Sequence, residues 1–585
     1  MGFLQKYDFV KIVSKYIRQT NTRLKGLLIY LSLTQFISIT ESDGCVMSRR
    51  SILSFCMVPI LVGISVPSPE AATVPASLRV DGGAIAQAPA RADGVRVYKG
   101  IPYAAAPIGE RRWEPPAAVV PWQGVRSTDT FGADCMQAVN ENSPAERPRS
   151  EDCLFLNVWA PAKSGRHPVF VWIHGGGSRV GSGAQPTFDG SAFARKGIVV
   201  VTINYRLGPL GFLSTPELSA RSGYDASGNY GFMDVIAALG WVRRNIGRFG
   251  GEPGRVTIGG ESSGSVTTSV MMASPLAKGL FAQAIGESGS SLRRAEPASM
   301  GATTLAFEEK RGTALMQDLG ASDLAALRRV PAERVLASAA RLANGQFYNL
   351  PVVDGHLLPD APWRIFASGK FNDVPLLAGW NADEGSLTLL GPKRSFAQML
   401  QATYGAEAGA VARLYPHAPG DDQAALVAAA GHHNIAYPTW LWAYAAARFG
   451  RGPVYLYEFD HAPPVPEGTF GTGFDVRLAG AYHGAEIPYV FDTLEAQQGW
   501  RIAEADRAVA RQMNAWWAAF ISTGAPGGEG AAHWPRYVPG EAARRMQVTE
   551  HPWAVPDPDR TRFDGLMKVH AAIDPPLPGP PAPRR

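Results

Sequence analysis

Residues 255–273 read RVTIGGESSGSVTTSVMMA. An apolar run, Val256–Ile258, precedes a Gly-x-Ser-x-Gly pentapeptide at 260–264, and a second apolar stretch follows it. This order predicts a strand, a sharp turn and a helix. Such a turn strains the backbone of its central residue and needs small neighbours so that other groups can approach closely. The segment therefore predicts that Ser262 is a nucleophile exposed at a sheet edge, and that the Ser263 amide points to where an oxyanion forms.

Apolar runs and helical patterns alternate along the chain, which is typical of a mostly parallel sheet with helices on both faces. Several runs are continuously apolar, as expected for strands that are covered on both sides. A helix is predicted from about Phe232 to Ile246, with Trp241 and Ile246 on its buried side. Besides Val256–Ile258, strands are predicted at Leu154–Trp159, Val169–Ile173, Ile198–Asn204, Gln283–Gly286, Pro375–Gly379 and Val454–Phe459.

The composition gives material for a large core and no sign of a nucleic-acid partner. Of 585 residues, 46% are hydrophobic, and 56 basic residues stand against 51 acidic ones. No dense Lys/Arg stripe with interleaved aromatic residues occurs, so nucleic-acid binding is unsupported. From about Ala295 to Arg448 the chain is rich in Ala and Leu at helical spacing, which predicts helical excursions that cover the site.

The first part of the chain is predicted to be a targeting segment rather than part of the fold. The paired Arg49 and Arg50 precede an apolar run and then small residues, as in a bacterial export signal of the twin-arginine or Sec type. We expect an upstream extension at 1–46, an export signal at 47–76, a catalytic domain at 77–572 and a disordered Pro-rich tail at 573–585. No later segment reaches about 18 uninterrupted apolar residues, so the mature chain is predicted to be exported, periplasmic or secreted, without stable membrane insertion.

A serine hydroxyl becomes a nucleophile only with a base in reach and a carboxylate that orients the base. Many histidines follow Ser262, and composition does not choose among them. His483 lies in GAYHGAEIPYVF (480–491), where glycines permit a loop that brings an imidazole over the nucleophile. An apolar strand also runs into Asp383-Glu384-Gly385, which places a carboxylate at the carboxyl end of the sheet. Only one of these two acids can hold the base.

A second glycine-rich segment, VWIHGGG at 171–177, also follows a predicted strand. Its glycines expose backbone N–H groups, which are suited to hold an oxyanion and are worth about 3–4 kcal/mol each. A plain turn is the simpler interpretation. A phosphate cradle is poorly supported, because no Gly-Lys-Ser/Thr follows. In the oxyanion interpretation, His174 is a structural loop residue and not a base.

Two of the four cysteines, Cys45 and Cys56, lie in the segment that we expect to be removed. The other two, Cys135 and Cys153, are 18 positions apart. They are either two buried thiols or one disulfide that closes a short loop, worth about 3 kcal/mol in the chain-entropy model. A disulfide fits an oxidising compartment.

Two long strings, FGGEPGRVTIGGESSG at 249–264 and EDCLFLNVWAP at 151–161, resemble the two signatures of the type-B carboxylesterase family, the cholinesterase-like esterases. Further similarity runs from Gly100–Ala104 to Trp534–Tyr537. The resemblance implies an α/β-hydrolase fold and a disulfide-bonded loop at the cysteine pair Cys135 and Cys153. It also selects Glu384 over Asp383, places His483 at the family's catalytic position, and assigns the oxyanion donors to Gly176, Gly177 and Ser263.

The resemblance also suggests two supporting residues and shows two departures. Glu261 is expected near the leaving-group side, and Ser288 matches a serine that can hydrogen-bond the triad acid; either could equally be an ordinary buried polar group. The family usually has an aromatic residue after the three glycines, whereas this chain has Ser178 and then Arg179. Ala106 replaces a common proline. The polar pair at 178–179 weakens any expectation of a purely fatty acyl substrate.

The predicted activity is hydrolysis of small-molecule carboxylic esters through an acyl-enzyme on Ser262, with neither a metal nor an organic cofactor. The substrate is not readable from the sequence. Aryl or p-nitrobenzyl-type esters and bulky xenobiotic or mycotoxin esters, such as fumonisin-like ones, are the candidates. An acyltransferase using the same acyl-enzyme and a catalytically silent binding protein on the same scaffold are the alternatives, and the oligomeric state stays open.

Overall fold

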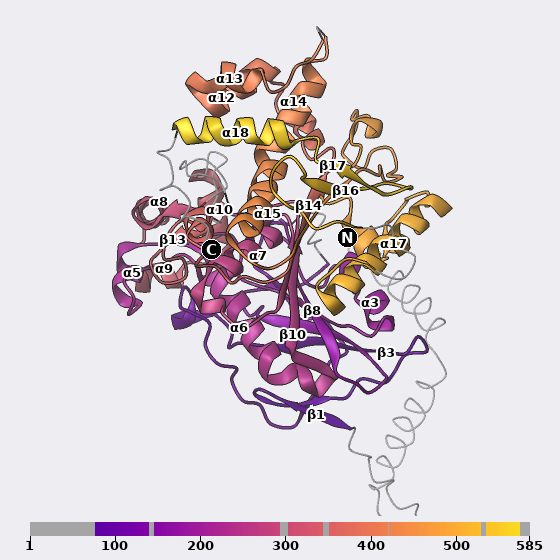
Figure 1. The fold of residues 1–585 in the computed structure, drawn as a ribbon. Coiled ribbons are helices and arrows are strands. Elements are labelled where there is room, and N and C mark those ends of the chain that lie inside the picture. Colours follow the sequence, from indigo (N-terminus) through magenta and orange to yellow (C-terminus); the bar gives the residue numbers. More distant parts are fainter. Residues whose placement is uncertain are drawn as a thin grey trace, which may run out of the picture. The chain divides into compact units, whose positions relative to one another are not determined.

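The apolar runs form the central strands of one mixed ten-stranded sheet in the computed structural model (Figure 1). The structure describes residues 76–139, 146–292, 302–342, 350–418, 420–527 and 534–573. All of these belong to one compact unit, Val74–Arg585. The predicted extension at 1–46 lies outside the described residues. So do the export signal at 47–76 and the tail at 573–585, apart from residues 76 and 573 at their inner ends.

The sheet is parallel in its centre and antiparallel at both edges. From β9 to β16 all six strand pairings are parallel, whereas β3, β7 and β17 pair antiparallel with their neighbours. In spatial order the strands are β17 (Trp553–Pro556), β16 (Arg544–Val548), β15 (Val454–Phe459), β14 (Leu376–Asn381), β11 (Gln283–Glu287), β10 (Gly251–Glu261), β8 (His167–Ile173), β9 (Val199–Ile203), β7 (Phe155–Pro161) and β3 (Val95–Pro102).

Both faces of the sheet are buried, which explains the continuous apolar runs. In β8, Val171 and Ile173 belong to one hydrophobic core, while Phe170 and Trp172 belong to a second core on the opposite face. This alternation follows from the two-residue period of a strand. The first core contains buried hydrophobic residues of α6, α7 and α15, and the second contains buried hydrophobic residues of α3, α16 and α17.

The helices cover both faces and build the excursions predicted for 295–448 (Figure 1). In that figure, α12, α13, α14 and α18 group together, and contacts join α12 with α13 and α14, and α13 with α18. The helices are α3 (Ser191–Arg195), α4 (Gly208–Phe212), α5 (Pro216–Arg221), α6 (Tyr230–Asn245), α7 (Ser263–Ala273), α8 (Leu305–Leu319), α9 (Leu324–Arg329), α10 (Ala332–Leu342), α11 (Pro362–Ala367), α12 (Phe396–Tyr404), α13 (Ala408–Ala412), α14 (Asp422–Gly431), α15 (Tyr437–Phe449), α16 (Ile487–Phe491), α17 (Glu504–Thr523) and α18 (Arg560–Ile573).

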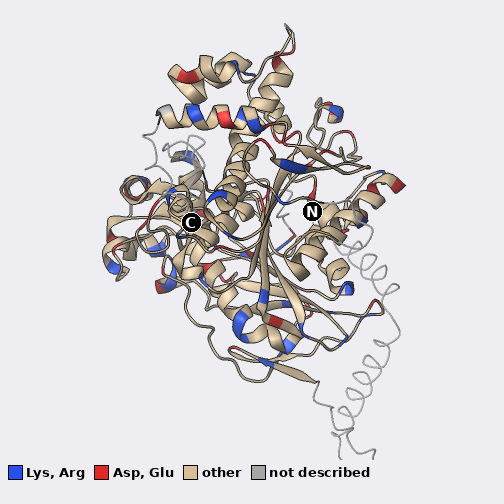
Figure 2. Cartoon of the chain, in the orientation of Figure 1, with Lys and Arg blue, Asp and Glu red and all other residues tan. Residues whose placement is uncertain are grey.

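Smaller elements complete the fold. A π-helical turn, His432–Ala436, joins α14 to α15. Three short sheets consist of β1 (Ser77–Val80), β2 (Gly83–Ala86) and β4 (Val125–Arg126); β5 (Asp134–Cys135) and β6 (Arg149–Ser150); and β12 (Thr303–Thr304) and β13 (Val352–Val353). Within the described ranges, no helix is long and apolar enough to span a bilayer. Charged residues of both signs are dispersed over the helices and loops (Figure 2).

The predicted helix Phe232–Ile246 corresponds to α6, and Trp241 and Ile246 are fully buried as expected. Each predicted strand overlaps an observed one. The segment Val256–Ile258 lies in the buried part of the longer β10, and the edge strands β3 and β17 and the strand β16 beside β17 were not predicted.

Candidate active site

Ser262 occupies a strained turn between β10 and α7. Its backbone angles are φ 54° and ψ −121°, a conformation that L-residues rarely adopt and that costs about 1–3 kcal/mol. The turn needs glycines on both sides, since a Cβ on Gly264 would lie 2.0 Å and one on Gly260 2.4 Å from the carbonyl oxygen of Ile173. The predicted strand–turn–helix with its small neighbours is therefore present.

Three side chains from separate segments meet at this turn. The Ser262 hydroxyl lies 2.9 Å from Nε2 of His483, and Nδ1 of His483 lies 2.6 Å from Oε2 of Glu384. Ser262 follows β10, Glu384 follows β14, and His483 lies on the loop between β15 and α16. The elements thus bring a hydroxyl, an imidazole and a carboxylate together at the carboxyl ends of parallel strands.

Asp383, the neighbour of Glu384, holds the loop that carries His483. Asp383 accepts a hydrogen bond from the backbone N–H of Ala481 at 2.9 Å. Gly480 has φ 54°, and a Cβ there would lie 2.1 Å from the Asp383 carboxylate. Asp383 and Glu384 therefore point in different directions, and only Glu384 contacts the imidazole.

Asn381, at the end of β14, links the carboxylates around the histidine. Its backbone N–H donates to Oε1 of Glu384 at 2.8 Å, which fixes the carboxylate that faces the ring. Its side-chain amide donates to Glu486 at 2.6 Å and to the carbonyl oxygen of Tyr482 at 2.7 Å. The end of β14 thus holds Glu384, Glu486 and the histidine loop in place.

Ser288 does not contact Glu384, which corrects the expectation drawn from the sequence. Its hydroxyl donates to Oε1 of Glu486 at 3.2 Å. The reason is the backbone of Ser288, whose φ of 56° and N–H bond to the carbonyl of Gly379 fix its direction. Ser288 therefore reaches the triad acid only through the network of Glu486 and Asn381.

Glu261 is buried beside the imidazole, as expected for a supporting residue. Its Oε1 lies 3.3 Å from Nε2 of His483, on the same ring nitrogen that faces Ser262. Burial raises the pKa of Glu261 to about 8, although His483 opposes the rise. Burial likewise raises the pKa of Glu486 to about 7, with Glu384 adding to the effect.

The nearby acids and burial shift the pKa of His483 in opposite directions. Burial disfavours the charged ring, but the nearby carboxylates of Glu261 and Glu384 outweigh it and raise the pKa of His483 to about 10. Protonation of Glu261 would remove its part of this attraction. The imidazole must be neutral to accept the serine proton, so the ionisation of Glu261 bears on when His483 can act as a base.

The glycine segment predicted for oxyanion binding lies against the strained turn. Gly176 and Gly177 have φ of 99° and 64°, and a Cβ on Gly176 would lie 2.2 Å from the carbonyl oxygen of Val180. The Ser178 N–H donates to the Ser263 hydroxyl at 2.9 Å, which ties this segment to the start of α7. Burial lowers the pKa of His174 to about 4, so its ring is neutral, as a structural loop residue requires.

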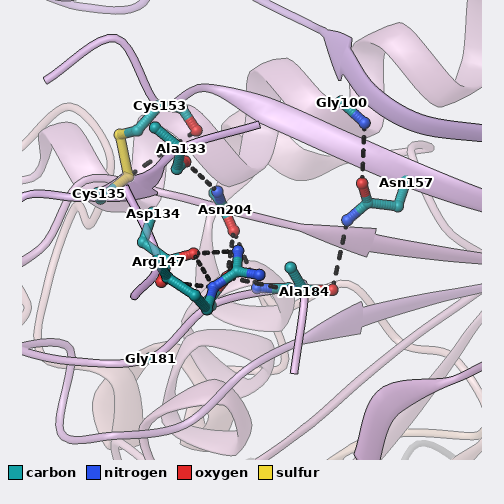
Figure 3. Close-up of polar contacts among 12 residues, drawn as sticks. Gly100, Ala133, Asp134, Cys135, Arg147, Cys153, Asn157, Gly181, Ala184 and Asn204 are labelled. Atoms are coloured by element: carbon teal, nitrogen blue, oxygen red, sulfur yellow. Dashed lines mark hydrogen bonds and ion pairs between the residues drawn. A yellow bond between two sulfur atoms is a disulfide. The ribbon is translucent and has the colours of Figure 1, made fainter. Parts of the chain in front are cut away.

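A disulfide-braced region supports the far end of this segment (Figure 3). Cys135 and Cys153 are joined, with their Cα atoms 4.9 Å apart. The Gln137 side chain bonds both the N–H and the carbonyl of Gly181, at 2.7 and 2.8 Å. Asn204 bridges the carbonyl of Ala133 and the N–H of Gly183, at 3.0 and 2.9 Å. The disulfide-braced region thus holds the chain just after the glycine segment at 175–177, and the disulfide is consistent with an oxidising compartment.

A small pocket of about 40 Å³ opens at Ser262, Ser263 and Gly177. Asn434 of the π-helical turn lines this pocket and also a larger neighbouring cleft of about 790 Å³. Among the described residues, no group of three or more His, Cys, Asp or Glu side chains is arranged to hold a metal ion. The arrangement suits acyl transfer to a serine.

Sequence reasoning did not identify several residues around the site, among them Glu486, Asn381, Glu287 and Asn434. Glu486 stands in the same motif as His483, but nothing in the string indicates that it packs against Asn381. Glu287 ends β11 and accepts the indole N–H of Trp517 at 2.7 Å, a contact between residues 230 positions apart. The sequence offered one signal for each of the other two residues. Glu287 ends β11, the strand between β10 and β14, and Asn381 ends β14, the strand that Glu384 follows.

Comparisons with known proteins agree with this geometry. The model of the family described as "Carboxylesterase family" matches residues 78–563. The chain is 38% identical over 469 residues to fumonisin B1 esterase of Sphingopyxis macrogoltabida, covering 76% of this chain and 82% of that protein. It is 36% identical over 471 residues to para-nitrobenzyl esterase of Bacillus subtilis, covering 76% and 89%. The crystal structure of a Geobacillus stearothermophilus carboxylesterase superposes with a TM-score of 0.73 at 32% identity, covering 84% of this chain and 99% of that one.

Proposed function

The chain belongs to the carboxylesterase family and is a carboxylic ester hydrolase, and we propose that it works through an acyl-enzyme on Ser262 with His483 and Glu384 completing a triad. One observation carries the proposal. A strained serine, an imidazole and a buried carboxylate form a continuous hydrogen-bonded chain with distances of 2.9 and 2.6 Å. Such a chain lets the hydroxyl lose its proton as it attacks.

In the first half of the reaction, the Ser262 oxygen attacks the ester carbonyl while its proton moves to Nε2 of His483. Glu384 accepts the Nδ1–H of the ring, which keeps the correct tautomer and stabilises the imidazolium. The backbone N–H groups of Gly176, Gly177 and Ser263 are the proposed oxyanion donors. The imidazolium then gives its proton to the departing alcohol.

In the second half, water attacks the acyl-serine, His483 and Glu384 act again as base and orienting acid, and Ser262 is the leaving group. His483 takes the proton of the water and returns it to Ser262 as the acid product leaves. The proposed cycle consumes one water per ester. An acyltransferase would divert the acyl group to an added alcohol instead, so product analysis with an alcohol present separates the two activities.

Two finer assignments belong to the same proposal. The substrate names of the two relatives make p-nitrobenzyl-type esters and bulky mycotoxin esters the first to assay. The span 77–572 is proposed as the catalytic domain. Export is proposed from the sequence signal at 47–76, and the disulfide is compatible with it.

The test is Ser262→Ala with aryl ester turnover and fluorophosphonate labelling as readouts. We expect kcat to fall by about 10⁴ to 10⁶ and labelling to vanish, while the circular dichroism spectrum is unchanged. Ser290→Ala is the matched control, since Ser290 lines the same pocket without contacting the imidazole. Turnover and labelling of Ser262→Ala at the wild-type level would rule the proposal out.

A further inference from the structure

The pocket at Ser262 is too small to hold both halves of most esters. It measures about 40 Å³, whereas the neighbouring cleft measures about 790 Å³. Ligand sites usually enclose about 300–1,000 Å³. Asn434 forms part of both walls, so the cleft adjoins the pocket at this residue. The cleft is therefore the neighbouring space that could take the larger half of a substrate bound at Ser262.

The cleft carries two cations with no ionic partner among the described residues. Lys393 and Arg394 lie on its wall, just before α12, and both are exposed. No ion pair joins either of them to another residue in the described part of the chain. Their charges are thus available to a ligand in the cleft.

The two acids of the cleft wall are already engaged. Asp475 pairs with Arg477 at 2.6 Å, and its hydrogen bonds with Arg477 lower the pKa of Asp475 to about 2. Asp422 lies 3.1 Å from Nε2 of His417. Hydrogen bonds to the carbonyl of Tyr415 and to Asp422 raise the pKa of His417. Arg477 thus balances Asp475, and Lys393 and Arg394 outnumber the remaining acid of the wall, Asp422, so the cleft has an excess of positive charge.

The rest of the wall is mostly apolar near these cations. Phe396, Met399 and Leu426 come from α12 and α14. A ligand that suits this wall has an apolar stem and a negatively charged end.

We propose that the cleft binds the larger half of the ester and favours substrates in which that half carries a carboxylate on an apolar stem, bound by Lys393 and Arg394. This inference rests on the proposed function of Ser262. It assigns substrate selection to residues outside the triad and outside the oxyanion segment. Carboxylate binding by exposed cations is also screened by salt, so the preference should weaken at high ionic strength.

The experiment compares charged and neutral esters of the same shape. For the acyl half, the pair is mono-p-nitrophenyl suberate and its ω-carboxamide analogue. For the alcohol half, the pair is the acetate ester of 4-(4-hydroxyphenyl)butanoate and its carboxamide. The readout is the ratio of kcat/KM for the charged ester to kcat/KM for the neutral one, at about 0.02 M and about 0.5 M NaCl.

The variant is Lys393→Gln/Arg394→Gln. The matched control is Lys310→Gln/Arg334→Gln, which removes two exposed cations on α8 and α10, outside the cleft wall. We expect the ratio for at least one ester pair to fall roughly fivefold in the cleft variant at low salt. The control should keep the wild-type ratio, and the neutral esters should be turned over at similar rates by all three proteins.

An unchanged ratio for both ester pairs, with the neutral esters still hydrolysed, would overturn the inference and leave the proposed function standing. An equal fall in the control would also overturn it, because the effect would then come from net charge. No turnover of any of the four esters, together with no fluorophosphonate labelling of Ser262, would contradict the proposed function itself, and the inference with it.

Discussion

Glu261 sets the proton affinity of the histidine beside it, and its replacement by glutamine should move the pH profile of the enzyme. In the proposed mechanism, His483 accepts the serine proton only when its ring is neutral, so kcat/KM should rise as pH increases through the pKa of His483. The Glu261 carboxylate, 3.3 Å from Nε2, stabilises the charged ring and raises that pKa. Glu261→Gln removes the negative charge, so the pKa falls and the acidic limb moves to lower pH.

The size of the shift follows from the distance. Two unit charges 3.3 Å apart attract by about 5 kcal/mol at an effective dielectric constant of about 20, which corresponds to 3 to 4 pKa units. Two features make the expected pKa shift smaller than this value. The His483 side chain is 26% exposed, so solvent screens it, and burial raises the pKa of Glu261 to about 8, so its carboxyl is only partly ionised near neutral pH. We expect a shift of about 1 to 2 units.

The assay is the pH dependence of kcat/KM for p-nitrophenyl acetate between pH 5 and about 11, measured by initial rates with the uncatalysed hydrolysis subtracted. Glu261→Asp keeps the charge and should leave the acidic limb closer to its wild-type position. Glu252→Gln removes a half-buried acid that pairs with Arg166 at the other end of β10, and it should leave the limb unchanged. If the limb of Glu261→Gln stays in place or moves to higher pH, the assignment of Glu261 as the group that raises the histidine pKa is wrong.

Two further outcomes concern stability. Cys135→Ser/Cys153→Ser opens the disulfide loop and should lower the free energy of unfolding by about 3 kcal/mol, measured by urea denaturation under oxidising conditions; an unchanged midpoint would refute a bracing role. Gly264→Ala places a Cβ 2.0 Å from a backbone oxygen of the neighbouring strand and should yield inactive, poorly folded protein. Gly409→Ala, in a helix with open space around the glycine, should fold normally, and equal tolerance of both changes in thermal melts would contradict the packing argument.

The sequence predicted the centre of the sheet because the central strands are apolar on both faces. It did not predict β16, whose RRMQV segment is polar yet largely buried. Arg545 in this strand pairs with Glu458 of β15 at 2.6 Å and with Asp559 at 2.8 Å, and Gln547 donates to Glu458 at 2.9 Å. A strand held by paired charges has no hydrophobic period, so pattern reasoning passes over it.

For the site, the resemblance supplied Ser262, Glu384 and His483, and the structure brings them within hydrogen-bond distance. The resemblance gave the wrong hydrogen-bond partner for Ser288, because the partner of a buried hydroxyl depends on which carboxylate the fold places beside it. Glu486 was missed for the same reason. Buried polar groups need partners, but the sequence does not say which distant residue provides them.

The strain at Ser262 shows why a pentapeptide alone is a weak signal for a nucleophile. Its N–H donates to the carbonyl of Glu287 on β11 at 2.8 Å, so the neighbouring strand fixes the turn. A Cβ on Gly289 would lie 2.5 Å from the Ser262 carbonyl oxygen, so the next turn must also lack a side chain there. Ser288, between these two contacts, has a positive φ of its own. A strained backbone persists only where its surroundings over-determine it. The orientation of the Ser262 hydroxyl is therefore a property of two adjacent strand ends together, and a Gly-x-Ser-x-Gly string without a strand of the Glu287-Ser288-Gly289 kind beside it would relax into an ordinary turn.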